Sequence, residues 1–159
     1  MALTYEPIAT VTTSGVSTFV VMSSIPATYT DLVLVGRYIK TTASSARITL
    51  NADTGSNYSQ TDLYNTSSGR ETSVTRVFIM NYVTSSTTEP NASVTHIMNY
   101  SNTTTYKTLL DRSGRVGGGT VLSAMIWRNT GAINRIDIDT STGTFSAGTT
   151  FTLYGITAA

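Results

Sequence analysis

Hydrophobic and polar residues alternate along most of the chain, most clearly in residues 125–156. This stretch contains three strand-like runs separated by turns rich in Gly, Ser and Thr. In the middle run, Ile136 and Ile138 alternate with charged residues, as in a strand with one buried and one solvated face. The last run, residues 150–156, has large side chains on both faces, which predicts an inner strand covered on both sides. We therefore expect this final run to belong to the core.

The same pattern predicts strands and no helix in the rest of the chain. Residues 31–40 are apolar on both faces in their first half, which predicts a central strand with Gly36 as a bulge or close-packing point. Residues 51–64 are dense in turn formers and predict a loop. The glycine-rich residues 112–120 predict a second, flexible loop. Further strands are predicted at residues 8–13, 17–23, 47–50, 70–83, 92–101 and 121–128.

About ten strands without a helix must cover their own faces, which requires two packed sheets or a closed barrel. Strand number and length favour an all-β, antiparallel two-sheet sandwich, with a jelly roll as the first prediction. An immunoglobulin-like sandwich is the alternative, although the Cys and Trp spacing of antibody domains is absent. The length of 159 residues predicts a single domain, residues 1–159, with one core.

Composition narrows the possible functions. Charged residues make up 12% of the chain and the formal net charge is +1, which favours neither charge-driven disorder nor a nucleic-acid partner. About a third of the residues are Ser or Thr, so hydroxyl groups supply solubility where most proteins use charge. The chain has no Cys, no signal-like start and no apolar run of about 20 residues. We expect a protein made in the cytoplasm, without a membrane partner.

The sequence offers little support for catalysis. His96 is the only histidine, and there is no nucleophile elbow or cysteine to complete a triad. Asp137 and Asp139 lie on the same face of a strand, about 7 Å from each other. Glycosidases use pairs of carboxyl groups at such separations. We interpret that face as solvated, where no apolar pocket would raise a carboxyl pKa. The prediction is a non-enzymatic protein with no catalytic residue and no cofactor.

A calcium-like spacing of side-chain oxygens occurs within residues 51–62. The weak candidates for a bound cation are Asn51, Asp53, Asn57 and Asp62. The match to an EF-hand loop fails because Gly55 comes one place too early and the last position lacks the bidentate Glu. We therefore predict Asx turns without a metal ion.

A sugar-binding surface is a further hypothesis, because the chain carries several aromatic side chains. Tyr58, Tyr64 and Trp127 are the candidates for glycan contact. The alternative is that Trp127 lies in the core and the tyrosines pack at an edge or interface. The glycines at 117–119 follow two arginines, but the P-loop pattern is absent, which favours a hairpin tip over a phosphate site.

Five stretches of the chain together resemble one protein family. They are S-S-I-P-A-T-Y-T-D-L-V-L-V, D-T-G-S-N-Y-S, N-Y-S-N-T-T-T-Y-K-T, W-R-N-T-G-A-I-N-R-I and G-T-T-F-T-L-Y-G-I, at residues 23–35, 53–59, 99–108, 127–136 and 148–156. In this order they span nearly the whole chain, which is similar to small proteins encoded among the structural genes of tailed bacteriophages, of the cyanophage and marine phage type. The resemblance implies a β-sandwich virion component without a catalytic role, and it defines no functional residues.

These observations lead to ranked hypotheses. The first is a capsid decoration or cement protein on the head surface of the virion, contacting the major capsid protein. We expect a homo-oligomer, with a trimer favoured, because virion parts repeat by symmetry. The second is a tail-fibre or collar subunit that binds a host surface glycan. A carbohydrate-binding module is the third.

Overall fold

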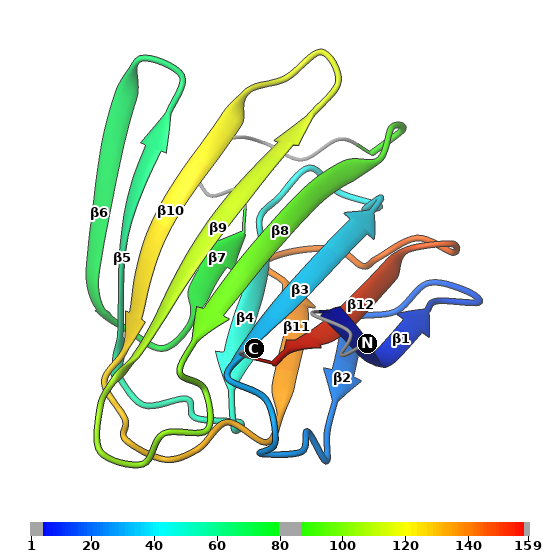
Figure 1. The fold of residues 1–159 in the computed structure, drawn as a ribbon. Helices are drawn as coiled ribbons and strands as arrows, with labels where there is room; N and C mark the ends of the chain where they lie inside the picture. Colours follow the sequence, from blue (N-terminus) through cyan, green and yellow to red (C-terminus); the bar gives the residue numbers. More distant parts are fainter. Residues whose placement is uncertain (1–4, 80–86, 158–159) are drawn as a thin grey trace.

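The computed structural model describes residues 5–79 and 87–157, and these residues form two packed antiparallel sheets without a helix (Figure 1). The predicted all-β sandwich is therefore confirmed. The strands are β1 (Tyr5–Thr12), β2 (Phe19–Met22), β3 (Asp31–Tyr38), β4 (Ala46–Leu50), β5 (Tyr58–Tyr64), β6 (Ser67–Val74), β7 (Val77–Ile79), β8 (Asn91–Met98), β9 (Lys107–Arg115), β10 (Thr120–Trp127), β11 (Ile136–Thr140) and β12 (Thr150–Ile156).

The two sheets differ in size. The large sheet has the strand order β1-β12-β3-β8-β9-β10-β5-β6, and the small sheet has the order β2-β11-β4-β7. Without the hairpins β5–β6 and β9–β10, the large sheet would keep the order β1-β12-β3-β8. The chain then crosses between the sheets at every step except from β4 to β7. The two-sheet sandwich is thus shown, and its jelly-roll topology stays a prediction.

The inner strands predicted from the sequence are found. Strand β12 lies between β1 and β3, and β3 lies between β12 and β8. Gly36 is a close-packing point, since a Cβ atom there would lie 2.6 Å from the ring of Phe151. One detail was wrong: Phe151 and Leu153 are buried, but Tyr154 and Ile156 are only half-buried. The outer face of β12 is therefore not fully covered.

The core between the sheets is aliphatic and aromatic. Phe151 stacks on Tyr38, with ring centroids 5.6 Å apart, and meets Phe145 edge to face. Tyr58 and Trp127 form a second stacked pair, 6.3 Å apart. These rings join one continuous cluster of buried side chains contributed by both sheets.

Two predicted loops are in part strands. The turn formers of residues 51–57 do form a loop, but residues 58–64 are strand β5, because Gln60 and Asp62 face inward and are hydrogen-bonded there. Residues 112–115 complete β9, and the glycines that follow turn the chain into β10. Residues 70–83 were predicted as one strand, but β6 and β7 lie in different sheets, and residues 80–83 fall outside the described residues.

Candidate functional site

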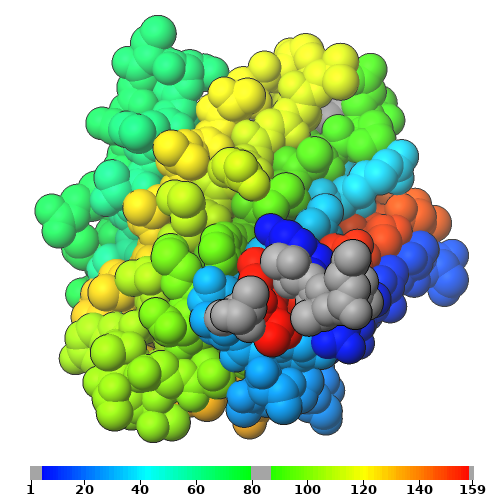
Figure 2. Space-filling view, viewed as in Figure 1, coloured from blue at the N-terminus to red at the C-terminus, as the bar shows by residue number. Residues whose placement is uncertain are grey.

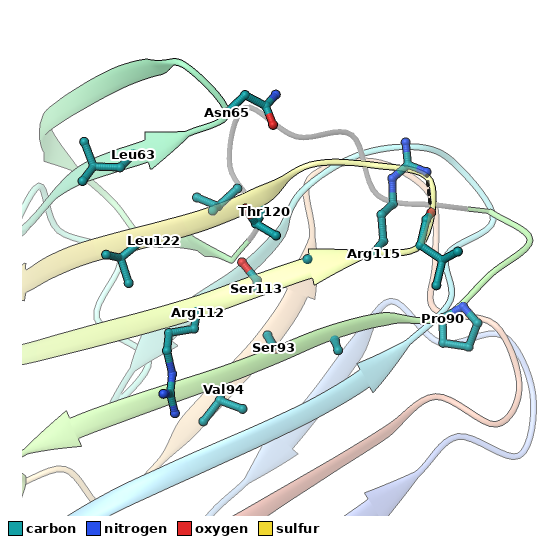
Figure 3. Close-up of a pocket in the computed structure, with 14 residues that line it drawn as sticks. Leu63, Asn65, Pro90, Ser93, Val94, Arg112, Ser113, Arg115, Thr120 and Leu122 are labelled. Carbon is teal, nitrogen blue, oxygen red and sulfur yellow. Dashed lines mark hydrogen bonds between the residues drawn. The ribbon is translucent and has the colours of Figure 1, made fainter.

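An open groove of about 670 Å³ lies on the large sheet, where β5, β10, β9 and β8 run side by side (Figure 3). Side chains alternate along these strands, so Leu63 and Leu122 face away from the small sheet. The register places Leu63 opposite Leu122, Leu122 opposite Arg112, and Arg112 opposite Val94. These four side chains form a row across the outer face.

The floor of the groove is made of small residues. Gly114 lies opposite Ala92 on one side and Thr120 on the other. A Cβ atom at Gly114 would lie 3.1 Å from the methyl group of Thr120 and 3.4 Å from the carbonyl oxygen of Gly119. The glycine therefore keeps the backbone of β9 open to an approaching chain.

The groove carries positive charge and no carboxylate among the described residues that line it. Arg112 is exposed and forms no hydrogen bond or ion pair within residues 5–79 and 87–157. Arg115, at the tip of the β9–β10 hairpin, donates a long hydrogen bond of 3.5 Å to the carbonyl oxygen of Val116 (Figure 3). An arginine in an apolar setting suits a planar anionic group.

The groove belongs to a wider apolar band on the outer face of the large sheet. The exposed fractions are 56% for Leu63, 42% for Leu122, 39% for Leu110 and 38% for Val35. These residues come from β5, β10, β9 and β3, strands that form the front surface in Figure 2. The outer face of a sandwich in water is usually polar, so several exposed apolar side chains on it indicate an interaction surface.

A polar row crosses the inner face of the same strands. Thr95, Asp111, Ser123 and Asp62 lie directly opposite one another across four strands, and all are buried. Thr95 donates to Asp111 at 2.8 Å, and Ser123 donates to Asp62 at 2.5 Å. Burial raises the pKa of Asp111 to about 6, although the Thr95 hydroxyl opposes the rise. This polar row fixes the register of the strands beneath the groove.

Gln60 extends the polar row to the small sheet. Its Nε2 donates to Asp62 at 2.6 Å and to the carbonyl oxygen of Phe78 at 2.9 Å. Its Oε1 accepts the backbone N–H of Phe78 at 2.7 Å. One side chain on β5 therefore pairs both backbone groups of a residue on β7.

The stretch with calcium-like spacing, residues 51–62, is organised around Asp53. The carboxylate accepts hydrogen bonds from Gly55 N at 2.8 Å, Asn57 Nδ2 at 2.9 Å and Trp127 Nε1 at 2.7 Å. Burial raises the pKa of Asp53, but the hydrogen bonds, that from Trp127 foremost, outweigh burial and hold it below its ordinary value. Three donors thus occupy this carboxylate.

The other calcium candidates point elsewhere. The Asn51 side chain accepts the backbone N–H of Asn134 at 2.9 Å and donates to the carbonyl oxygen of Ala132 at 2.8 Å. Asp62 lies in the buried polar row of β5. Within the described part of the chain, no group of three or more His, Cys, Asp or Glu side chains could hold a metal ion.

The predicted glycan contacts are wrong for two of the three residues. Tyr58 is fully buried and Trp127 is 1% exposed, because the two rings stack in the core. The Tyr58 hydroxyl accepts the backbone N–H of Leu50 at 3.0 Å, and burial raises its pKa. Tyr64 is half-buried and packs against the core. The alternative interpretation is therefore confirmed for Trp127, whereas Tyr58, which it placed at an edge or interface, lies in the core.

The solvated face predicted for Asp137 and Asp139 is also wrong, since each residue is only 6% exposed. Strand β11 is an inner strand of the small sheet, and arginine side chains lie over its outer face. Arg47 binds both oxygens of Asp139 at 2.8 and 2.7 Å, and Arg76 adds a bond of 3.1 Å. Asp137 pairs with Arg135 at 2.9 Å. Both carboxylates are thus occupied by guanidinium groups.

His96 has a structural partner. Its Nε2 lies 3.0 Å from Asp31 Oδ2, and Asp31 Oδ1 also accepts the backbone N–H of Asn99 at 2.7 Å. The imidazole therefore helps to hold the start of β3 beside the end of β8. The glycines at 117–119 turn β9 into β10, as predicted for a hairpin tip, and Gly117 has the positive φ of 65° that favours glycine.

Two buried lysines tie loops to the sandwich. Lys107 Nζ donates to the carbonyl oxygens of Thr105 at 2.8 Å and Thr130 at 3.1 Å. Lys40 Nζ donates to the carbonyl oxygen of Ser44. Burial lowers the pKa of Lys40 to about 7, helped by a neighbouring arginine. Neither amine is exposed at a surface where it could act as a nucleophile.

Comparison with known proteins gives no family for this chain. No protein-family model matches it, and no curated protein matches it. Within the described residues, no helix is long and apolar enough to cross a membrane.

The groove was missed by sequence reasoning. Residues 120–127 carry apolar side chains on both faces, Val121 and Met125 inward and Leu122 and Ile126 outward, and this two-sided pattern was the available signal. A single strand of this kind does not show where a groove forms. That depends on which strands lie beside it.

Proposed function

We propose that this protein is a non-enzymatic structural protein of a tailed-phage virion, a capsid decoration or cement protein on the surface of the head. The uncovered apolar band on the outer face of the large sheet carries the proposal. A two-layer sandwich with an exposed apolar face suits lasting attachment to another protein. We also propose a jelly-roll topology for the sandwich, a fold that occurs in viral capsid proteins, and the alternation of strands between the two sheets supports it.

The state of the acidic side chains also supports a structural role. Asp137 and Asp139 are held by arginines, and Asp53 is held by three hydrogen-bond donors. A general acid or base needs a carboxyl group within reach of a substrate. Asp111 has a raised pKa, but it is buried inside the sandwich, where no substrate reaches it.

A second exposed surface supports self-association. Strand β2 lies at the edge of the small sheet, and Phe19 and Val21 on it are exposed, as is Val16 just before it. Apolar edge residues that repeat around a symmetry axis give a closed ring with one interface per subunit. We propose a trimer that uses this edge for its own contacts and the outer face of the large sheet for the major capsid protein.

Labelling of intact particles tests the proposal. An antibody against the protein, viewed by electron microscopy, should decorate the head, and quantitative mass spectrometry of purified particles should give hundreds of copies. Label confined to the tail, with a dozen copies or fewer, would replace the head assignment with the tail-fibre or collar alternative. Absence from purified particles would refute a virion role altogether.

A further inference from the structure

The outer groove has a composition that restricts what can fill it. Leu63, Leu122 and Val94 supply apolar walls, and Arg112 is the exposed cation between them. The described lining residues include no aromatic side chain and no carboxylate. The groove therefore has apolar walls, with Arg112 in the middle and Arg115 at its hairpin end.

Burial of Arg112 sets the first requirement for an occupant. A guanidinium group removed from water without a partner costs several kcal/mol. The neighbouring Asp111 is buried on the inner face of the sheet, and no described residue that lines the groove has a carboxylate, so the occupant itself has to bring one. A carboxylate fits best, because it can accept two parallel hydrogen bonds from one guanidinium group.

The same chemistry argues against other occupants. A sugar would need an aromatic face on which to stack, and the groove lining has none. Two copies packed groove to groove would bury two Arg112 side chains, and the described lining of neither groove offers a carboxylate. Nucleic acid would need a row of cations to neutralise several phosphates, and the apolar walls give no such row.

We propose that this groove binds an extended segment of a different protein, with apolar side chains for the Leu63–Leu122 wall and one Asp or Glu for Arg112. Gly114 and Ala92 leave the floor low enough for a backbone to approach the sheet. The inference rests on the proposed function only in assigning the segment to another virion protein, in the first place the major capsid protein. The groove chemistry alone specifies the segment.

Selection from a random-peptide display library tests the groove directly. The full chain is immobilised and panned as wild type, as Arg112→Glu and as the matched control Arg70→Glu. Arg70 lies on β6 and does not line the groove. The wild type and the control should enrich peptides with apolar residues around an Asp or Glu, and Arg112→Glu should enrich peptides with Lys or Arg at that place.

A wild-type peptide from that selection then serves as the probe in a fluorescence anisotropy titration. Leu122→Ser should weaken its binding about tenfold, the loss expected from removing one buried leucine contact. The inference is overturned if no peptide family is enriched, or if Arg112→Glu selects the same acidic peptides as the wild type. It is also overturned if light scattering shows a dimer that Arg112→Glu dissociates, because the occupant would then be a second copy.

The two proposals fail separately. If the peptides behave as expected while the protein is absent from purified particles, the virion role is wrong and the groove specificity stands. If the protein decorates the head while Arg112→Glu and Leu122→Ser particles keep the full copy number, the virion role stands. Attachment to the head through this groove is then refuted.

Discussion

The two ends of the sandwich differ in the side chains that fill the interior. Around β3 and β12 the interior is filled by hydrocarbon and aromatic rings, including Tyr38, Phe145 and Phe151. Around β5, β9 and β10 the inward face carries a row of hydroxyl and carboxyl groups, with Asp62 and Asp111 fully buried. An apolar filling tolerates small shifts, whereas a hydrogen bond between buried side chains such as Thr95 and Asp111 forms in one register only. The aromatic end thus supplies stability, and the polar end fixes the strands beneath the groove.

The largest expected effect lies at the aromatic end. Phe151→Ala should remove about 4 kcal/mol from the free energy of unfolding, because it leaves a cavity beside Tyr38 and Phe145. Urea denaturation followed by tryptophan fluorescence measures the loss. Thr152→Ala, one residue along on the outer face, is the matched control and should cost less than about 1 kcal/mol. Equal losses would show that this end is not the main source of stability.

The polar end should respond to pH. The folded-state pKa of Asp111, about 6, lies above its ordinary value, so the folded protein holds this proton more tightly than the unfolded chain does. The contribution of Asp111 to stability is thus greatest below about pH 4 and falls as the pH rises to about 6, by roughly 3 kcal/mol. Unfolding free energies of the wild type and Asp111→Asn, measured across this range, should diverge accordingly. A constant difference would contradict the argument.

The link between the sheets should have an intermediate effect. Gln60→Leu removes the hydrogen bonds to both backbone groups of Phe78, so the free energy of unfolding should fall by about 2 kcal/mol. Hydrogen exchange of the β7 amides should also become faster. Thr61→Ala changes the next, outward-facing residue and should alter neither quantity measurably. Unchanged exchange in Gln60→Leu would mean that other contacts hold β7.

The smallest effect on stability is expected on the outer face. Leu122→Ser removes an exposed side chain, so the free energy of unfolding should change by less than about 0.5 kcal/mol. Thermal unfolding measures this quantity. A large loss would show that Leu122 supports the fold. Its weight in the groove would then have to be measured with a different variant.

The fold was predictable for strands with a clear apolar pattern on one or both faces. The two-sided apolar runs of β3 and β12 identified inner strands, because the period of buried side chains can be read from the sequence. The alternation in β11 identified a strand, but not that arginine side chains cover its polar face. Strand β5 lies in a stretch that its turn formers predict to be a loop. Gln60 and Asp62 occupy its inward positions, so the sequence shows no apolar face there. A polar residue that is buried and hydrogen-bonded looks the same in the sequence as one that is solvated.

The groove could not be predicted for a different reason. Its wall and its cation come from β5, β9 and β10, and Leu63 and Arg112 are brought together only by the hairpins that extend the large sheet. The suggestion of glycan contact was wrong for Tyr58 and Trp127, because their rings stack on each other in the core. The N–H group of Trp127 donates to Asp53 at the rim of the core. Both cases depend on which residues of neighbouring strands lie side by side, and one sequence carries no periodic signal of that.

The seam between β1 and β12 has a mechanical consequence. These strands are antiparallel, with Tyr5 opposite Ile156, so the two outer ends of the described chain lie at the same end of the seam. A force pulling these two residues apart would meet the backbone hydrogen bonds one at a time, like a zipper, and would open the seam at low tension.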